Sequence, residues 1–339
     1  MQFINLKEQY NRLSSDIKKR IDNVLNHGQY IMGPEVFELE KKLAEFTNSK
    51  YCLSCSSGTD ALLIALMAKN IGPGDRIITT PFTYIATAEV IKLLGATPVF
   101  VDIDLKTFNI DCSQIEKELN QSKIKGIIPV NLFGLPADYD SIYQICNQKD
   151  IFILEDAAQS FGAVYKSKRS GSLADISATS FFPAKPLGCY GDGGAIFTDN
   201  NQLYNIMESI RIHGKGDNKY DCDRVGLNGR LDTIQAAILL SKLEIYNEEI
   251  KLRQNVANLY SKKLEGYVGI PFIPDKYESV WAQYSILLDN ESIRSNIMNS
   301  LKDNNIPSVI YYQKPLHIQK TFHDLNYHKG DFPISEDIS

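Results

Sequence analysis

Residues 51–101 read YCLSCSSGTDALLIALMAKNIGPGDRIITTPFTYIATAEVIKLLGATPVFV, in which short apolar runs alternate with stretches of helix length. The runs Tyr51–Ser54, Arg76–Thr79 and Thr97–Val101 have the length and composition of buried strands, and the segments between them have helical periodicity. Alternation of this kind is typical of a largely parallel sheet covered by helices on both faces. The stretch therefore predicts an α/β fold.

The same alternation continues to residue 198 and brings the predicted sheet to seven strands. The further strands are predicted at Gly126–Val130, Ile151–Leu154, Ala178–Phe182 and Ala195–Thr198. Helices are predicted at Leu6–Asn26, Pro34–Asn48, 60–69, 83–94, Tyr139–Asn147 and Leu231–Leu264. After Gly266 the segments become shorter and proline-interrupted. We therefore expect a large domain over residues 1–245 and a smaller C-terminal α+β domain over residues 246–339.

Composition excludes several classes of protein. The 339 residues include 36 Lys and Arg against 41 Asp and Glu, a net charge of −5, which disfavours the basic surface of a nucleic-acid-binding protein. No apolar run approaches the roughly 18–20 residues of a membrane span. The start, Met1-Gln-Phe-Ile-Asn-Leu-Lys-Glu, is charged where a signal peptide needs an apolar core. We therefore predict a cytoplasmic protein without nucleic-acid or membrane partners.

The six cysteines fit the same compartment because they are scattered through a long chain, unlike a disulfide framework. Cys52 and Cys55 form a C-x-x-C, but no second such pair follows and the histidines lack metal-ligand spacing. We read this pair as small residues near a strand end and predict no metal site.

In sheets of this type, ligands bind at the carboxyl ends of the strands. Ser56-Ser-Gly-Thr-Asp60 follows the first strand and opens a helix, which suits either a phosphate cradle or an ordinary helix cap. Glu155-Asp156-Ala-Ala-Gln159 follows another strand. A carboxylate buried there needs a cation or a donor, unless it too only caps a helix.

Lys185 lies on a proline-bracketed turn, Pro183-Ala-Lys-Pro186, after a third strand. A lone lysine is usually solvated, but the prolines restrict the backbone of this one. A buried Asp, a phosphate-binding turn and a fixed lysine together suit pyridoxal phosphate, with the lysine forming the Schiff base. Nucleotide-binding alternatives are disfavoured: there is no G-x-x-x-x-G-K-[ST], and the segment from Gly214 to Lys219 lacks the third glycine of a dinucleotide fingerprint.

The same motifs resemble those of the DegT-type sugar-nucleotide aminotransferases, which are fold-type-I pyridoxal phosphate enzymes. The matching motifs are Ser57-Gly-Thr-Asp-Ala-Leu, Glu155-Asp-Ala-Ala-Gln, Ser180-Phe-Phe-Pro-Ala-Lys185, Gly191-Asp-Gly-Gly and Gly226-Leu-Asn228-Gly-Arg230-Leu-Asp. The resemblance runs in order from Phe3 to about Gln319. Two of these stretches, 180–198 and 224–233, are most similar to the subgroup that acts on UDP-2-acetamido-2-deoxy-3-oxo-glucuronate.

The resemblance implies roles for individual residues. Lys185 and Asp156 would be catalytic, with Lys185 as acid–base group and Asp156 paired with the pyridine nitrogen. The cofactor-binding residues would be Gly58, Thr59, Tyr84, Asp156, Gln159, Ser180, Lys185 and Asn228. Among them Tyr84 would stack on the cofactor ring, although its place at the start of a helix also suits a core residue. Gln159 would meet the phenolic oxygen.

The resemblance also implies a homodimer with shared active sites, because Asn228 would reach the cofactor phosphate of the neighbouring subunit. Substrate would be contacted by Arg230, Tyr312 and His317. Arg230 has a planar fork that suits a carboxylate or diphosphate, but a salt bridge to Asp232 or Asp223 is an equal alternative.

The activity that the resemblance implies is transfer of the amino group of L-glutamate to a keto sugar of a nucleotide-sugar, such as UDP-2-acetamido-2-deoxy-3-oxo-glucuronate, in cell-surface polysaccharide (O-antigen) synthesis. A sister aminotransferase acting on another keto sugar shares every catalytic residue. A dehydratase of the same fold is disfavoured by Lys185, and a regulator that binds the cofactor without turnover is disfavoured by the complete site. Relatives continue with a further strand and a closing helix, so we expect a shortened small domain.

Overall fold

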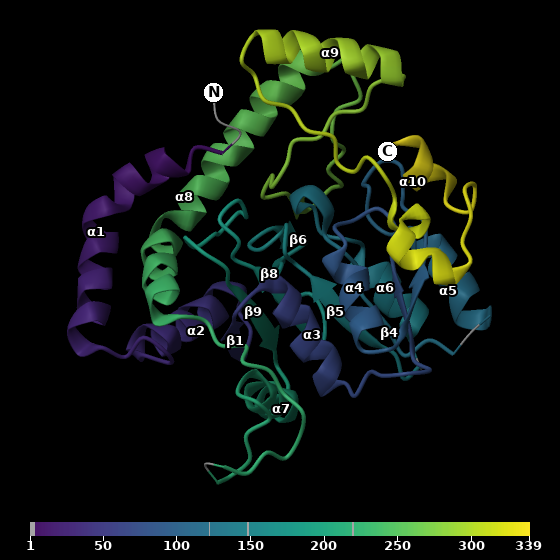
Figure 1. The fold of residues 1–339 in the computed structure, drawn as a ribbon. Helices are drawn as coiled ribbons and strands as arrows, with labels where there is room; N and C mark the ends of the chain where they lie inside the picture. The colour runs from purple at the N-terminus through teal and green to yellow at the C-terminus, as the bar shows by residue number, and fades with distance from the viewer. Residues whose placement is uncertain (1–3, 122, 148, 219) are drawn as a thin grey trace.

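A computed structural model describes residues 4–121, 123–147, 149–218 and 220–339 of the chain, and a seven-stranded sheet lies at its centre (Figure 1). The strand order is β1-β9-β8-β5-β4-β2-β3. The strands are β1 (Tyr51–Cys55), β2 (Arg76–Thr79), β3 (Thr97–Phe100), β4 (Gly126–Ile127), β5 (Phe152–Asp156), β8 (Ile176–Ser180) and β9 (Gly194–Thr198). All seven lie where the apolar runs predicted strands, although β8 begins two residues earlier than expected.

The sheet is largely parallel, as predicted. Strands β3, β2, β4, β5 and β8 pair in parallel, whereas β9 runs antiparallel to both of its neighbours, β8 and β1. In this register Asp156 on β5 is paired with Ala178 on β8, and Ser180 on β8 with Gly194 on β9. The carboxyl ends of β5 and β8 therefore meet at one edge of the sheet.

Helices cover both faces of the sheet. The helices are α1 (Leu6–His27), α2 (Pro34–Thr47), α3 (Gly58–Ala68), α4 (Ala86–Leu93), α5 (Cys112–Gln121), α6 (Tyr139–Cys146), α7 (Asn201–Arg211), α8 (Thr233–Leu264), α9 (Glu291–Asp303) and α10 (Pro333–Asp337). On one face α3, α4 and α7 pack against alternate strand residues such as Leu53 and Leu154. On the other face α2 and α8 pack on Cys52 and Phe197, and α5 and α6 on Ile153.

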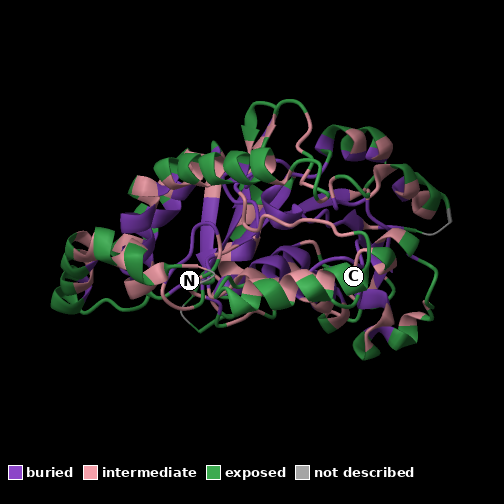
Figure 2. Ribbon diagram, turned by 90° about the horizontal axis from the view of Figure 1, so that it is seen from above, coloured by how far each residue is buried: buried purple, intermediate pink, exposed green. Residues whose placement is uncertain are grey.

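The period-two alternation of strand side chains produces these two cores. Figure 2 shows the result from above: the strands are buried between helices whose outer surfaces are exposed.

Helix α4 begins at Ala86, three residues later than predicted, because the chain after Pro81 turns and the Phe82 N–H bonds to the Thr80 hydroxyl.

The remaining segments connect the C-terminal part to the sheet. A second, three-stranded sheet joins β10 (Tyr277–Glu278) to β6 (Val164–Tyr165) and β7 (Lys168–Arg169). Two 3-10 helices, η2 (Leu316–Ile318) and η3 (Lys320–Leu325), follow α9 and pack with Phe332, the residue before α10, against Ala88 and Phe100. In Figure 1 this yellow segment lies beside α4 and α5.

The division into domains at residue 245 stays a prediction. Helix α8 crosses that position without a break, and the segment from η2 onward packs on the large sheet. Over the described residues, no helix combines the length and apolar character that crossing a membrane requires.

Candidate active site

Asp156 is the last residue of β5 and is 5% exposed. One carboxylate oxygen accepts a hydrogen bond from Thr87 Oγ1 at 2.7 Å, and the other from the Ala158 N–H at 3.1 Å. Among the described residues it forms no ion pair. Burial raises the pKa of Asp156, opposed by these two donors and by the charge of Lys185. The carboxylate is therefore short of partners in a place where a cationic group would stabilise it.

The preceding residue, Glu155, shows the contrast. It points to the opposite face of β5, where it accepts hydrogen bonds from the side chains of Ser170, Ser177 and Asn131 and from the N–H groups of Gly171 and Leu173. Burial raises the pKa of Glu155 as well. Its bonding capacity is nevertheless filled by the protein, so Glu155 is structural and Asp156 is the carboxylate left for a ligand.

Lys185 reaches the same edge of the sheet from the turn after β8. Its backbone N–H bonds to the Phe182 carbonyl at 2.8 Å, which closes the turn. Burial lowers the pKa of Lys185, and the nearby Asp156 opposes that shift. Among the described residues its amine has no hydrogen-bond partner. A lysine with a lowered pKa and a free amine is suited to act as a nucleophile or a base.

Gly58 and Ser180 form a close contact between the start of α3 and the end of β8. A Cβ atom at Gly58 would lie 2.5 Å from the Ser180 Cβ, so only glycine fits here. Ser57 caps α3 by accepting from the Asp60 N–H, while the N–H groups of Gly58 and Thr59 have no acceptor within the described part of the chain. Free N–H groups at a helix N-terminus, beside a hydroxyl, make a site for a phosphate.

Gln159 connects the site to the C-terminal part of the chain. Its Oε1 accepts from the Phe133 N–H at 2.8 Å, and its Nε2 donates to the Tyr312 hydroxyl at 3.1 Å. The Tyr312 ring packs edge-on against Phe82, and burial raises the pKa of its hydroxyl.

Tyr84, two residues before α4, is 60% exposed, so its ring lies at the surface and not in the core.

Asn228 and Arg230 lie together on the segment before α8. Arg230 donates to the Asn228 side-chain oxygen, with an Nε–Oδ1 distance of 3.1 Å. It forms no ion pair with Asp223 or Asp232 among the described residues, so the salt-bridge alternative is wrong in this structure. The Gly229 carbonyl accepts from the Ser56 N–H, which holds the segment beside the turn after β1. The reach of Asn228 into a partner's site stays a prediction.

His317 lies apart from these groups. Its side chain has no exposed surface, its Nε2 pairs with Glu336 at 3.0 Å, and its ring packs on Phe332. Burial lowers the pKa of His317, and its Nδ1 has no hydrogen-bond partner among the residues that the structure describes. The structure therefore does not bring His317 to the open site, and its predicted contact with substrate stays a prediction.

Two residues that support the site were not predicted from the sequence. Thr87 orients Asp156, and the Phe133 N–H fixes the amide of Gln159. Thr87 lies in the first turn of α4 and is buried, but nothing in the sequence distinguishes it from an ordinary polar residue near a helix start. Nothing in the sequence marks Phe133, since it acts through its backbone.

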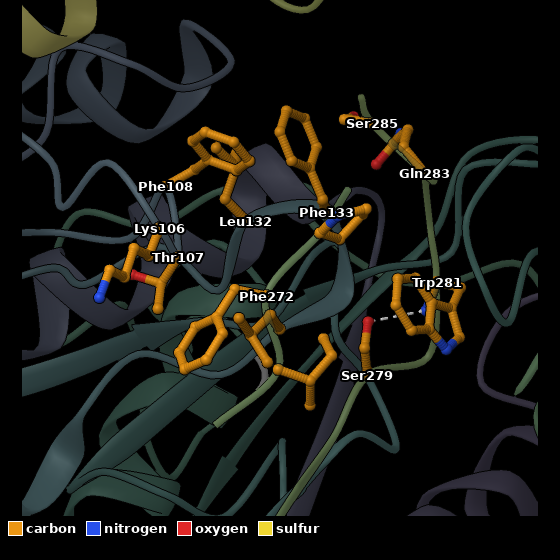
Figure 3. Close-up of a pocket in the computed structure, with 13 residues that line it drawn as sticks. Lys106, Thr107, Phe108, Leu132, Phe133, Phe272, Ser279, Trp281, Gln283 and Ser285 are labelled. Carbon is orange, nitrogen blue, oxygen red and sulfur yellow. Dashed lines mark hydrogen bonds between the residues drawn. The ribbon is translucent and has the colours of Figure 1, made fainter. Parts of the chain in front are cut away.

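The pocket in Figure 3 is a separate feature. It lies between the Leu132–Gly134 turn and residues 271–285, is lined largely by aromatic and apolar side chains, and contains none of the predicted site residues. Gln283 Oε1 is buried without a partner in this part of the molecule. One lining residue, Phe133, connects the pocket to the site, because its backbone N–H bonds to Gln159.

Comparison with known proteins agrees with this geometry. The DegT/DnrJ/EryC1/StrS aminotransferase family matches residues 11–339. A UDP-2-acetamido-2-deoxy-3-oxo-D-glucuronate aminotransferase of Pseudomonas aeruginosa is 50% identical over 99% of this chain and 92% of its own length. A pleiotropic regulatory protein of Geobacillus stearothermophilus is 40% identical, covering 98% and 89%. A UDP-N-acetyl-3-dehydro-alpha-D-glucosamine 3-aminotransferase of Acidithiobacillus ferrooxidans is 36% identical, covering 99% and 89%.

Solved structures give the same result. An aminotransferase from Brucella abortus superposes with a TM-score of 0.95 at 44% identity, covering all of this chain and 91% of that one. NtdA from Bacillus subtilis, solved with its bound cofactor PMP, has a TM-score of 0.89 at 31% identity and covers 97% and 75%. The α/β fold with its seven-stranded sheet is thus confirmed. The chain belongs to the DegT/DnrJ/EryC1/StrS aminotransferase family.

Proposed function

We propose that this aminotransferase moves the amino group of L-glutamate to the keto group of UDP-2-acetamido-2-deoxy-3-oxo-glucuronate. The observation that carries the proposal is that a half-buried lysine, whose amine has no hydrogen-bond partner among the described residues, lies near a buried carboxylate that accepts only two hydrogen bonds, where the carboxyl ends of β8 and β5 meet. The acceptor is taken from the name of the Pseudomonas relative, at 50% identity.

The cofactor of the family is pyridoxal 5'-phosphate, and the residues present fit it. The free amine of Lys185 suits its aldehyde, Asp156 suits its ring nitrogen, and the tight Gly58–Ser180 contact with the free N–H groups of α3 suits its phosphate. When bound, the cofactor supplies an electron sink that makes the α-proton of an amino acid removable.

The chain's own residues then have defined tasks. Ionised Asp156, oriented by Thr87, holds a proton on the ring nitrogen. The Phe133 N–H occupies Gln159 Oε1, so the amide presents its N–H donors to the site. Lys185 Nζ, with its lowered pKa, would take the α-proton of glutamate and give it up again within the same half-reaction. In the second half it would move a proton in the reverse direction, onto the sugar carbon that receives the amino group.

Arg230 is proposed to select the acceptor. The sugars named for the Pseudomonas and Acidithiobacillus relatives differ in that glucuronate carries a carboxylate where glucosamine does not. A guanidinium binds a carboxylate through two parallel hydrogen bonds. We expect Arg230→Met to lower kcat/KM for the glucuronate acceptor about tenfold to hundredfold, a loss of about 1.5–3 kcal/mol, with little change for the glucosamine acceptor. An equal loss on both acceptors would contradict this role.

The homodimer with shared sites is part of the proposal. Asn228 is exposed, and so are the large apolar residues Leu25, Tyr30, Ile31 and Phe37 around the α1–α2 connection, which suits a subunit interface. Mixed Lys185→Ala and Asn228→Ala subunits test it. Hybrid dimers would contain one intact site each and should recover about a quarter of the wild-type activity, because half of the dimers are hybrids. No recovery after subunit exchange would mean that each site is built from one chain.

The cellular setting is also part of the proposal. All six cysteines are free thiols, which supports a cytoplasmic location because structural disulfides are rare there. A role in cell-surface polysaccharide synthesis follows from the proposed acceptor. The substrate is identified by supplying L-glutamate and each keto-sugar nucleotide and measuring 2-oxoglutarate. An acceptor other than the 3-oxo-glucuronate giving the highest kcat/KM would favour a sister aminotransferase.

A regulator without turnover is the second candidate, favoured by the name of the Geobacillus relative. The absorption spectrum of the cofactor-loaded protein separates the two. Bleaching of the visible band by L-glutamate and its return with 2-oxoglutarate would establish catalysis. A band that ignores glutamate would favour the regulator.

A further inference from the structure

Lys242 is a buried cation without a carboxylate partner. It lies in the first half of α8 with 1% of its surface exposed, and among the described residues it forms no ion pair. Its ammonium donates to the Gly188 carbonyl at 2.5 Å and lies 4.1 Å above the Tyr190 ring. Burial lowers the pKa of Lys242 to about 8, opposed by Cys189 and Glu249. Keeping an ammonium here is costly, so its contacts need explaining.

Both contacts of Lys242 are made with the loop that carries Lys185. This loop, residues 181–191, leaves β8, forms the proline-bracketed turn and returns to β9. It is wound tightly: the Cys189 N–H bonds to the Phe181 carbonyl at 2.8 Å, and a Cβ at Gly188 would lie 2.6 Å from the carbonyl oxygens of Phe182 and Pro183. A shift of Gly188 would therefore displace the first residues of the turn.

Gly188 and the backbone N–H of Lys185 both contact the carbonyl oxygen of Phe182. The Phe182 carbonyl accepts the Lys185 N–H at 2.8 Å, and Gly188 packs directly on that same carbonyl. The carbonyls of Phe182 and Pro183 thus lie close to Gly188, whose own carbonyl accepts the hydrogen bond from Lys242 on α8. Helix α8 adds a second support, because Gln235 Oε1 accepts the Tyr190 N–H at 2.9 Å.

We propose that Lys242 is a positioning residue for Lys185: its ammonium fixes the Gly188 carbonyl and, through the Phe182 carbonyl, the backbone from which the reactive amine extends. The inference rests on the proposed function for the role of Lys185. Lys242 contacts the loop from helix α8, at Gly188 and Tyr190, and takes no part in the chemistry itself. A misplacement of about 1 Å in a reacting group can lower a rate about 100-fold, so such a support is able to affect turnover.

Lys242→Met tests the proposal, because it keeps most of the side-chain volume and removes the charge and the donor. Its matched control is Tyr246→Phe, which removes the buried hydrogen bond of the same helix to the Phe161 carbonyl; among the described residues the Tyr246 hydroxyl forms no hydrogen bond with the loop. Two quantities are measured: amide hydrogen exchange at Lys185 and Cys189 in the cofactor-free protein, and the rate and saturation of the half-reaction with L-glutamate.

We expect Lys242→Met to speed exchange at both amides at least tenfold. The half-reaction should slow at least tenfold, with the glutamate concentration for half-saturation changed less than threefold. Tyr246→Phe should alter neither quantity more than threefold, whatever its loss in Tm. The proposal is overturned if Lys242→Met stays within threefold of wild type in exchange and rate, or if Tyr246→Phe has the same effect.

Two further outcomes of the experiment also test the proposal. Should Lys242→Met not fold, Lys242→Gln, which keeps a neutral donor, is measured with the same criteria. If the wild-type protein shows no half-reaction with glutamate, the proposed function fails, while amide exchange still decides whether Lys242 fixes the loop.

Discussion

Asp156→Asn is expected to stabilise the cofactor-free protein while weakening its hold on the cofactor. Burial raises the pKa of Asp156 above the 3.8 of a free carboxyl, so keeping it ionised at neutral pH costs about 1.4 kcal/mol for each unit of the rise. An amide has the same shape, can still accept the Ala158 N–H and can donate to the Thr87 hydroxyl. We expect the free energy of unfolding at pH 7 to rise by about 1.4 kcal/mol for each unit of that rise in pKa, and Tm to rise with it.

The sign of the pH dependence follows from the raised pKa. Below the unfolded-state value of 3.8 the carboxyl is protonated in both states, so wild type and Asp156→Asn should have similar stability. As pH rises toward the folded-state pKa, the unfolded wild type ionises first and the wild type loses stability. The advantage of the variant should therefore appear as pH rises above the unfolded-state value and level off once pH exceeds the folded-state pKa.

Glu155→Gln is the matched control. Glu155 is equally buried and its pKa is also raised, but every group around its carboxylate is a donor. An amide nitrogen placed there would face N–H and O–H groups. We expect a loss of about 2–3 kcal/mol at pH 7, because at least one buried donor is left unsatisfied.

Thermal denaturation of the cofactor-free proteins from pH 4 to 8, together with titration by pyridoxal phosphate, measures both effects. Cofactor affinity of Asp156→Asn should fall about tenfold to hundredfold, since a charge-assisted hydrogen bond of about 1.5–3 kcal/mol is lost. If Asp156→Asn were destabilising at pH 7, or if its gain did not depend on pH, burial of an underbonded charge would be the wrong description of this carboxylate.

Three further substitutions test neighbouring contacts. Thr87→Val removes a hydrogen bond to the Asp156 carboxylate and should weaken cofactor binding, measured by fluorescence titration, about tenfold. Its control, Thr79→Val, loses a buried hydrogen bond to a backbone carbonyl and should lower Tm without changing that affinity. Gly58→Ala should abolish or strongly weaken cofactor uptake in the same titration, because its Cβ would lie 2.5 Å from that of Ser180; unchanged uptake would contradict the cradle. Arg211 forms a buried ion pair with Glu40, so Arg211→Met leaves the Glu40 carboxylate buried without its cation. We expect the free energy of unfolding, measured by urea denaturation, to fall by about 3–5 kcal/mol. A loss below about 1 kcal/mol would show that this ion pair is dispensable.

The sequence predicted much of the fold for a simple reason. Buried parallel strands need continuous apolar runs, and such runs are visible in residues such as Ile151–Leu154 without knowledge of their neighbours. The edge where ligands bind follows from that topology, which is why Asp156 and Lys185 could be identified from position and chemistry alone.

Contacts between distant segments could not be predicted in this way. Tyr312 meets Gln159 only through tertiary packing, so it entered the predicted site by resemblance and not by pattern. The contacts of His317 with Glu336 and Phe332 likewise could not be predicted, because no local pattern marks them; its contact with substrate stays a prediction. The supporting roles of Phe133 and Lys242 depend on a backbone amide and on the path of a loop, which composition does not reveal.

Reduction of the cofactor-loaded protein with borohydride, followed by peptide mass spectrometry, tests the central claim most directly. Reduction makes the bond between the cofactor and its lysine permanent, so the modified residue can be identified. The account predicts modification of Lys185, the one lysine placed beside Asp156 at the carboxyl ends of β5 and β8 in the described structure. Modification of a different lysine, or a loaded protein with no modified lysine, would contradict it.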